Sequence, residues 1–116
     1  MHELSIATEV IAIAEQEGSK RNLHNISEIG IRLGAFSGVD PEALSFCFEA
    51  ATMDTSLANT KLNIEWIPVK AECLSCKKDF EPEDYIFDCP YCKSNETEIV
   101  EGDDLRLQYL IGEWRS

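Results

Sequence analysis

Two pairs of cysteines, each with two residues between them, constrain this chain more than any other feature. The pairs are Cys73 with Cys76 and Cys89 with Cys92, and twelve residues separate them. In each pair a tight turn can direct both sulfurs at one ion, and two such turns supply the closed set of four thiolates of a structural zinc site. Because closed coordination leaves no open position for a substrate, we predict an ion that holds the fold together. Such an ion can contribute on the order of 10 kcal/mol to the folding of a small module.

The spacing alone leaves three other interpretations of these cysteines open. Two disulfides need an oxidising compartment, yet the first residues lack the basic region and long apolar run of a signal peptide. A redox pair of the thioredoxin type uses one C-x-x-C rather than two. Iron in a rubredoxin-like site has the same four-sulfur geometry as zinc. No stretch approaches the roughly 18 apolar residues that span a bilayer, so we expect a cytoplasmic protein with reduced thiols.

The charge balance limits the partners and marks an insert. The chain has 10 Lys and Arg against 22 Asp and Glu, a net charge of −12, so nucleic acid and membrane surfaces are not expected partners. Residues 70–104 hold eleven acidic and four basic residues, with few apolar ones, and cannot build an adequate core alone. We therefore predict a metal-stapled insert at residues 69–104. Within it, Glu81, Glu83 and Asp84 would form a solvated hairpin face, with recruitment of a metal ion or of a basic partner surface as the alternative.

The remaining residues predict an α+β domain. Apolar residues recur with helical spacing over residues 4–18, where Gly18 is a natural helix stop. Asp40-Pro41 opens a second helix that runs to about residue 53. Alternating apolar residues predict strands over 27–33, about 61–68 and about 105–114. The first two strands would be parallel across a crossover helix, and the third antiparallel. The predicted fold is a small three-stranded mixed sheet with two helices on one face, plus a zinc-ribbon insert with rubredoxin-like knuckles.

The first residues offer a second set of metal donors. Removal of an initiator methionine favours a small second residue, so His2 should leave Met1 in place. The Met1 amine, the His2 backbone nitrogen and the imidazole Nδ1 then close two chelate rings, and Glu3 can supply a fourth donor. Three nitrogens in a plane suit Ni(II) or Cu(II) at an open site that releases its ion readily. On the residues alone, an incidental His2 remains the alternative.

The hexapeptide Met1-His2-Glu3-Leu4-Ser5-Ile6, the chain length and the two late C-x-x-C pairs together resemble the HypA/HybF hydrogenase nickel-insertion proteins. The resemblance implies a metallochaperone, not an enzyme, that delivers Ni(2+) to the large subunit of [NiFe]-hydrogenase. It also implies cooperation with a HypB-type GTPase and, in some organisms, a role with urease maturation proteins. The protein would be a monomer or a homodimer.

The resemblance also implies roles for particular residues. Nickel binding would centre on His2, helped by Glu3, and structural Zn(2+) would lie on Cys73, Cys76, Cys89 and Cys92, which displaces the iron alternative. Residues 1–68 and 105–116 would then form a nickel-binding domain, and residues 69–104 a zinc-binding domain inserted before the last strand.

A few residues depart from the family pattern or compete with these assignments. Some family members place a histidine just after a C-x-x-C knuckle, where this chain has Lys77 and Lys93, so exchange of a zinc ligand for histidine is not expected. His24 is expected at the surface, and Cys47 on the apolar stripe of the second helix. Two rival functions remain on the residues alone, a zinc-ribbon interaction module without cargo and a rubredoxin-like electron carrier.

Overall fold

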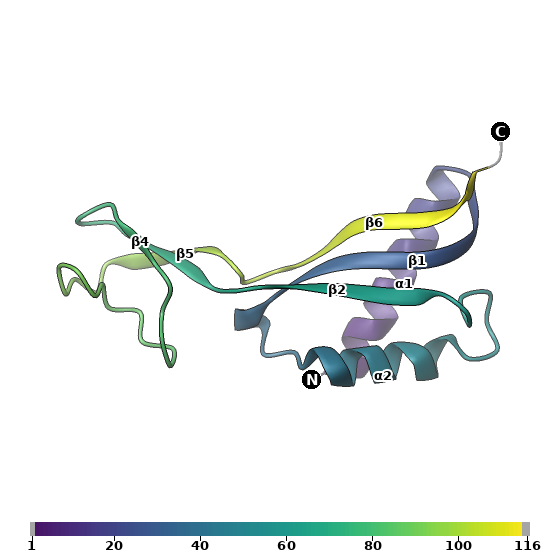
Figure 1. The fold of residues 1–116 in the computed structure, drawn as a ribbon, viewed down its shortest axis with the longest axis horizontal. Coiled ribbons are helices and arrows are strands. Elements are labelled where there is room, and N and C mark those ends of the chain that lie inside the picture. The colour runs from purple at the N-terminus through teal and green to yellow at the C-terminus, as the bar shows by residue number, and fades with distance from the viewer. Residues whose placement is uncertain (1, 115–116) are drawn as a thin grey trace. The chain divides into compact units, whose positions relative to one another are not determined.

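The computed structural model describes residues 2–114 of the chain (Figure 1). The first half contains helix α1 (Glu3–Lys20), strand β1 (Leu23–Gly34), the short 3-10 helix η1 (Ala35–Ser37) and helix α2 (Pro41–Thr52). The second half contains five strands: β2 (Lys61–Ile67), β3 (Lys70–Cys73), β4 (Asp79–Phe80), β5 (Thr97–Glu101) and β6 (Leu105–Trp114). No helix among these residues is long and apolar enough to cross a membrane.

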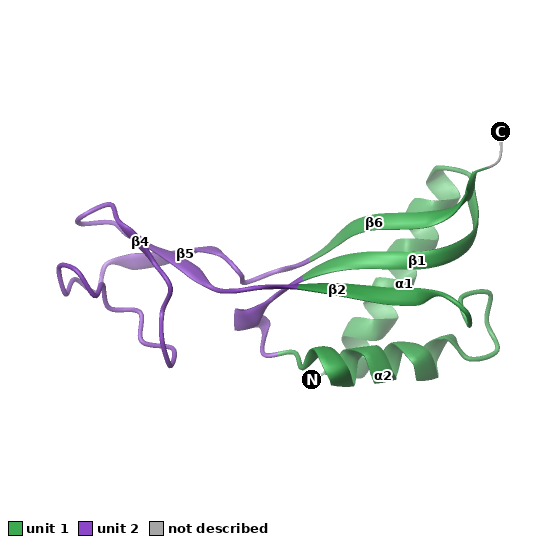
Figure 2. Cartoon of the chain, in the orientation of Figure 1, with its two compact units in different colours: residues 1–32, 39–65, 106–116 green, residues 33–38, 66–105 purple. Residues whose placement is uncertain are grey.

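The chain divides into two compact units (Figure 2). Unit 1 comprises residues 1–32, 39–65 and 106–116, and unit 2 comprises residues 33–38 and 66–105. Unit 2 therefore takes in the segment around η1, which the sequence had grouped with residues 1–68. The functional division into 1–68 with 105–116 and 69–104 stays a prediction.

Three strands form one mixed sheet in the order β2-β1-β6. The Thr60 hydroxyl, just before β2, donates to the carbonyl of Ile26, and Glu65 pairs with Arg32, so β1 and β2 run in the same direction. Bonds from the Ser27 hydroxyl to the Ile111 carbonyl and from the Asn25 amide to Glu113 show that β6 runs antiparallel to β1. The predicted three-stranded mixed sheet is confirmed.

The two helices pack against each other, as predicted for one face of the sheet. Each contributes a stripe of fully buried side chains, as does the alternating pattern of β1. In unit 1 these buried residues are Ala7, Val10 and Ala14 of α1, Ile29 and Ile31 of β1, and Leu44 and Phe48 of α2.

Helix α2 begins as the sequence predicts. The Asp40 carboxylate accepts a hydrogen bond from the Glu42 N–H at 3.0 Å, and Pro41 occupies the first helical position. The cap satisfies one of the backbone donors that a helix N-terminus leaves unpaired.

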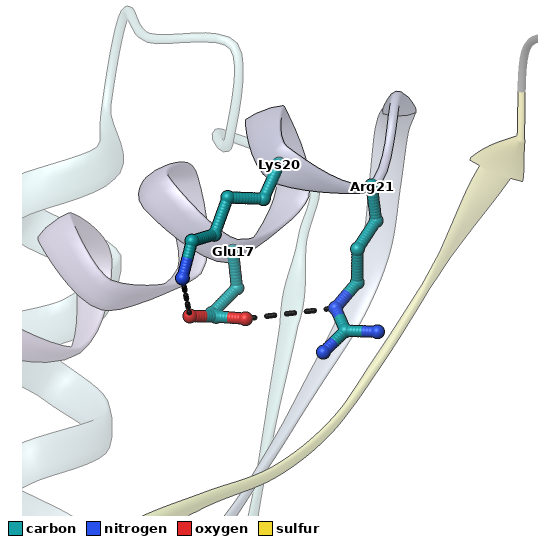
Figure 3. A network of polar contacts seen from close by, with 3 residues as sticks. All are labelled: Glu17, Lys20 and Arg21. Atoms are coloured by element: carbon teal, nitrogen blue, oxygen red, sulfur yellow. Dashed lines mark ion pairs between the residues drawn. The ribbon is translucent and has the colours of Figure 1, made fainter.

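Helix α1 ends later than the predicted stop at Gly18. Gly18 is buried within the helix, and the left-handed residue that reverses the chain is Asn22, with φ 55°. The last turn carries an exposed network in which Glu17 lies 3.5 Å from both Lys20 and Arg21 (Figure 3). Such surface pairs contribute at most about 1 kcal/mol to stability. The helix therefore continues past Gly18, and the chain reverses at the left-handed Asn22.

A matched pair of substitutions in α2 tests this core. We expect Phe48→Ala to lower the free energy of unfolding by about 3–5 kcal/mol, because it opens a cavity where the ring is now 1% exposed. Phe46→Ala removes the same ring from a site that is 71% exposed and should change stability by less than about 0.5 kcal/mol. Urea unfolding followed by circular dichroism measures both, and equal losses would contradict the assigned core.

Candidate metal centre

Unit 2 brings the four paired cysteines together. One sulfur from each of Cys73, Cys76, Cys89 and Cys92 lies within 4.8 Å of all the others. The Cys73 and Cys92 sulfurs are 3.6 Å apart, and those of Cys76 and Cys89 are 3.7 Å apart. A tetrahedral ion with sulfur ligands at about 2.3 Å separates neighbouring sulfurs by about 3.8 Å, whereas a disulfide joins them at about 2.05 Å. The spacing therefore fits four ligands around one metal ion, and all four cysteines are free of disulfides.

The two C-x-x-C turns have the same backbone construction. The Lys77 N–H donates to the carbonyl of Cys73, and the Lys93 N–H donates to the carbonyl of Cys89, each at 2.9 Å. In both turns the N–H of the second cysteine also points at the sulfur of the first, at 3.5 Å. Both lysines adopt left-handed backbone angles, with φ 68° and 69°. These lysines therefore serve first as the residues that close the turns.

Backbone donors favour the thiolate form at one cysteine of each turn. Hydrogen bonds from N–H groups, that of Cys76 first, lower the pKa of Cys73. Burial opposes ionisation of Cys89, but N–H donors led by that of Cys92 lower its pKa to about 6. The Ser94 N–H favours ionisation of Cys92, yet the neighbouring Cys73 sulfur and burial raise its pKa to about 11. Four sulfurs this close can all ionise only when a cation shares the space.

The cluster is also the centre of a small apolar core. Cys73 and Cys89 are buried together with Ala71 and Phe80, and Phe87 packs against them. Strand β3 joins this core to its two antiparallel neighbours in the order β4-β3-β5. This small number of buried side chains cannot stabilise a unit of this size. We therefore expect a metal ion bound by the four sulfurs to stabilise it.

The N-terminal donors lie at the start of α1. His2 is exposed, and its carbonyl accepts the first helical hydrogen bond, from the Ile6 N–H at 3.0 Å. The Met1 amine, which was predicted as a donor together with His2 and Glu3, lies outside the described residues. The Glu3 carboxylate accepts a hydrogen bond from the Asp40 N–H at 3.2 Å, which lowers the pKa of Glu3. The sequence reveals the cap at Asp40, but a contact between residues 37 positions apart leaves no local signal.

Two further residues were weighed as ligands in the sequence. His24 is exposed on β1, as predicted, and Cys47 is half-buried in α2. Two lysines stay beside the knuckles: the Lys78 ammonium lies 4.9 Å from the centre of the Tyr91 ring, and that of Lys93 donates to the Pro90 carbonyl.

Comparisons with known proteins agree with this arrangement. A family profile described as hydrogenase/urease nickel incorporation, metallochaperone, hypA matches residues 1–111. The hydrogenase maturation factor HypA of Picosynechococcus sp. is 41% identical over 110 residues, which cover 95% of this chain and 97% of that protein. The hydrogenase maturation factor HybF of Klebsiella pneumoniae is 34% identical over 113 residues, covering 97% of this chain and all (100%) of that one.

A solved structure shows the same architecture. The solution structure of the Ni metallochaperone HypA from Helicobacter pylori superimposes with a TM-score of 0.73 at 26% identity, covering 99% of this chain and 100% of that one. The fold and the four converging thiols define a small metal-binding protein. With the profile and the relatives matching over nearly their full length, the chain belongs to the HypA/HybF family of hydrogenase maturation proteins and nickel metallochaperones.

Removing one thiol should unfold unit 2 while unit 1 stays folded. We expect Cys76→Ser to lose the bound metal ion and the dispersed amide resonances of residues 70–101, because their core depends on the cluster. Resonances of α1 and α2 should persist, because those helices share their own buried core. Metal analysis and two-dimensional NMR of the untagged protein measure both effects. Cys47→Ser is the matched control and should keep the ion. Collapse of the whole chain would contradict the separate cores.

Proposed function

We propose that this protein is a nickel carrier that binds Ni(2+) at its N-terminus and delivers it to the large subunit of [NiFe]-hydrogenase during maturation. The observation that carries the proposal is membership of a nickel-incorporation family over residues 1–111. The proposed ligands are the Met1 amine, His2 and Glu3. The exposed position of His2 supports them, because an ion held there can pass to a partner without unfolding the carrier.

The proposal assigns the chain a carrier's role without catalysis, and it includes partners. A HypB-type GTPase would cooperate in loading or release, the setting would be cytoplasmic, and urease maturation proteins are the second destination that the family description supports. In domain terms, residues 1–68 and 105–116 would present the nickel, and residues 69–104 would hold a structural ion.

Zinc is the ion that we propose for the four cysteines. The support is the chemistry of the donor set: four thiolates in a closed tetrahedral arrangement suit Zn(2+), which performs no redox chemistry there. The ion would hold the two knuckles together, and no substrate could reach it.

Metal analysis of untagged protein tests this assignment. We expect one zinc ion per chain and a colourless solution. Four cysteine ligands on ferric iron would instead give a red protein, and that outcome would restore the electron-carrier alternative.

Nickel binding should depend on the chain terminus. We expect His2→Ala to abolish tight Ni(2+) binding, measured by titration calorimetry with electronic spectroscopy, while the melting temperature stays within a few degrees because His2 supports no buried side chain. His24→Ala is the matched control, since that histidine is also exposed. Adding residues before Met1 turns the amine into an amide and should weaken binding as well.

Two results would count against the terminal site. If the extended protein binds Ni(2+) as tightly as the native one, the amine is not a ligand. If His24→Ala weakens binding as much as His2→Ala, the nickel ion lies elsewhere.

A further inference from the structure

Unit 2 contains an apolar groove with a cavity of about 470 Å³. Its apolar lining includes Trp66, Pro68, Pro82, Tyr85 and Phe87, and we call this feature the aromatic groove. Trp66 is 59% exposed and Tyr85 is 68% exposed, so two large aromatic side chains stand open to solvent around one hollow. Aromatic side chains of this kind dominate the binding energy of many protein interfaces.

The short helix η1 supports two aromatic residues that line the groove, Tyr85 and Phe87. The Phe36 N–H donates to the carbonyl of Gly102 at 2.9 Å, which fixes this short helix against the turn before β6. The Phe36 ring then contacts Phe87 edge-on, with centroids 5.7 Å apart, and Tyr85, with centroids 6.0 Å apart. Gly102 has φ 94°, and a side chain there would collide with the backbone at Val69. The groove is therefore formed before any partner arrives.

The turn that presents Tyr85 has an unusual backbone. Asp84 and Tyr85 are both left-handed, with φ 51° and 59°, between the bridged residues Glu83 and Ile86. The Ile86 N–H closes this turn on the Glu83 carbonyl at 2.9 Å. Two-residue turns of this kind favour Asn-Gly, because few other residues tolerate positive φ. Tyr85 contacts Phe36 but remains 68% exposed, so packing among the described residues covers only a small part of it.

The rim of the aromatic groove is acidic. Glu81 and Asp84 belong to its lining, and no lysine or arginine does. Within residues 2–114 neither carboxylate has an ion-pair partner. These two acids add to a chain of net charge −12, so the groove attracts cationic segments and repels acidic ones.

We propose that the aromatic groove is a docking site for a partner-protein segment that presents one large apolar side chain flanked by lysine or arginine. The apolar anchor would fill the hollow between Trp66 and Tyr85, and the basic flanks would face Glu81 and Asp84. This inference goes beyond nickel and zinc binding and does not depend on the N-terminal donors.

A set of labelled peptides tests the proposal on the metal-loaded full chain. The probe is a fluorescein-labelled peptide with a central phenylalanine between two lysines on each side. Its binding is measured by fluorescence anisotropy. We expect replacement of the phenylalanine by alanine to weaken binding at least tenfold, and replacement of all lysines by glutamates to abolish it. Raising the salt concentration should weaken the lysine peptide several-fold, because its flanks are solvent-exposed charges.

Matched variants locate the binding to the aromatic groove. Trp66→Ala should weaken the lysine peptide at least tenfold, whereas Trp114→Ala removes a tryptophan that is even more exposed but lies outside the groove, and should leave binding within twofold. Trp66→Phe should bind the lysine peptide with an intermediate affinity, and it replaces Trp66→Ala in the test if the alanine variant does not fold. Glu81→Gln with Asp84→Asn should weaken binding, since asparagine tolerates the left-handed position of Asp84. Glu9→Gln with Glu15→Gln, on the exposed face of α1, is the charge-matched control.

Three outcomes would overturn the proposal. The first is equal binding of the lysine and glutamate peptides, and the second is unchanged binding by both the Trp66→Ala and Trp66→Phe variants. The third is a concentration-dependent dimer that Trp66→Ala disrupts, without peptide binding, which would mean that a second copy fills the groove. His2→Ala should leave peptide binding unchanged, which keeps a failure of this proposal distinct from a failure of the nickel site.

Discussion

Convergence of four cysteine sulfurs in a space less than 5 Å across is the constraint on which unit 2 depends. Uncompensated, these sulfurs resist joint ionisation, as the pKa of about 11 at Cys92 indicates. A cation reverses that penalty and turns mutual repulsion into attraction. The two C-x-x-C turns, the short strands β3, β4 and β5, and Phe80 all pack around the four sulfurs. The same unit carries the aromatic groove, so an ion held by these sulfurs would also stabilise the surface that we propose for docking.

Unit 1 follows a different principle, because its two helices and β1 share buried aliphatic and aromatic side chains. Its stability comes from the burial of these side chains, and it needs no metal ion for its core. Of the proposed nickel donors, His2 is exposed and Glu3, at the start of α1, accepts a hydrogen bond from the Asp40 N–H. An exposed His2 would let the proposed nickel ion pass to a partner while this buried core stays intact.

The sequence predicted best what depends on local chemistry. The C-x-x-C spacing located the cluster, and Asp40-Pro41 located the start of α2, because both signals span only a few residues. Gly18 misled, since a glycine can lie inside a helix when a neighbour packs over it. The contact between Glu3 and Asp40 and the arrangement of Phe36 with Tyr85 join distant segments, which one sequence cannot reveal. The left-handed backbone of Tyr85 could not be predicted for another reason, because turn preferences place glycine at such positions.

One further consequence follows from the pairing of β3 with β5. Lys70 and Glu101 are opposite each other in that ladder, so everything between them leaves and rejoins the chain at adjacent points. Such a segment is a natural cassette, because lengthening, shortening or exchanging it alters no distance that the flanking backbone must span. Relatives could therefore diversify this part by transplantation, acquiring new surfaces while the remaining architecture stays as it is.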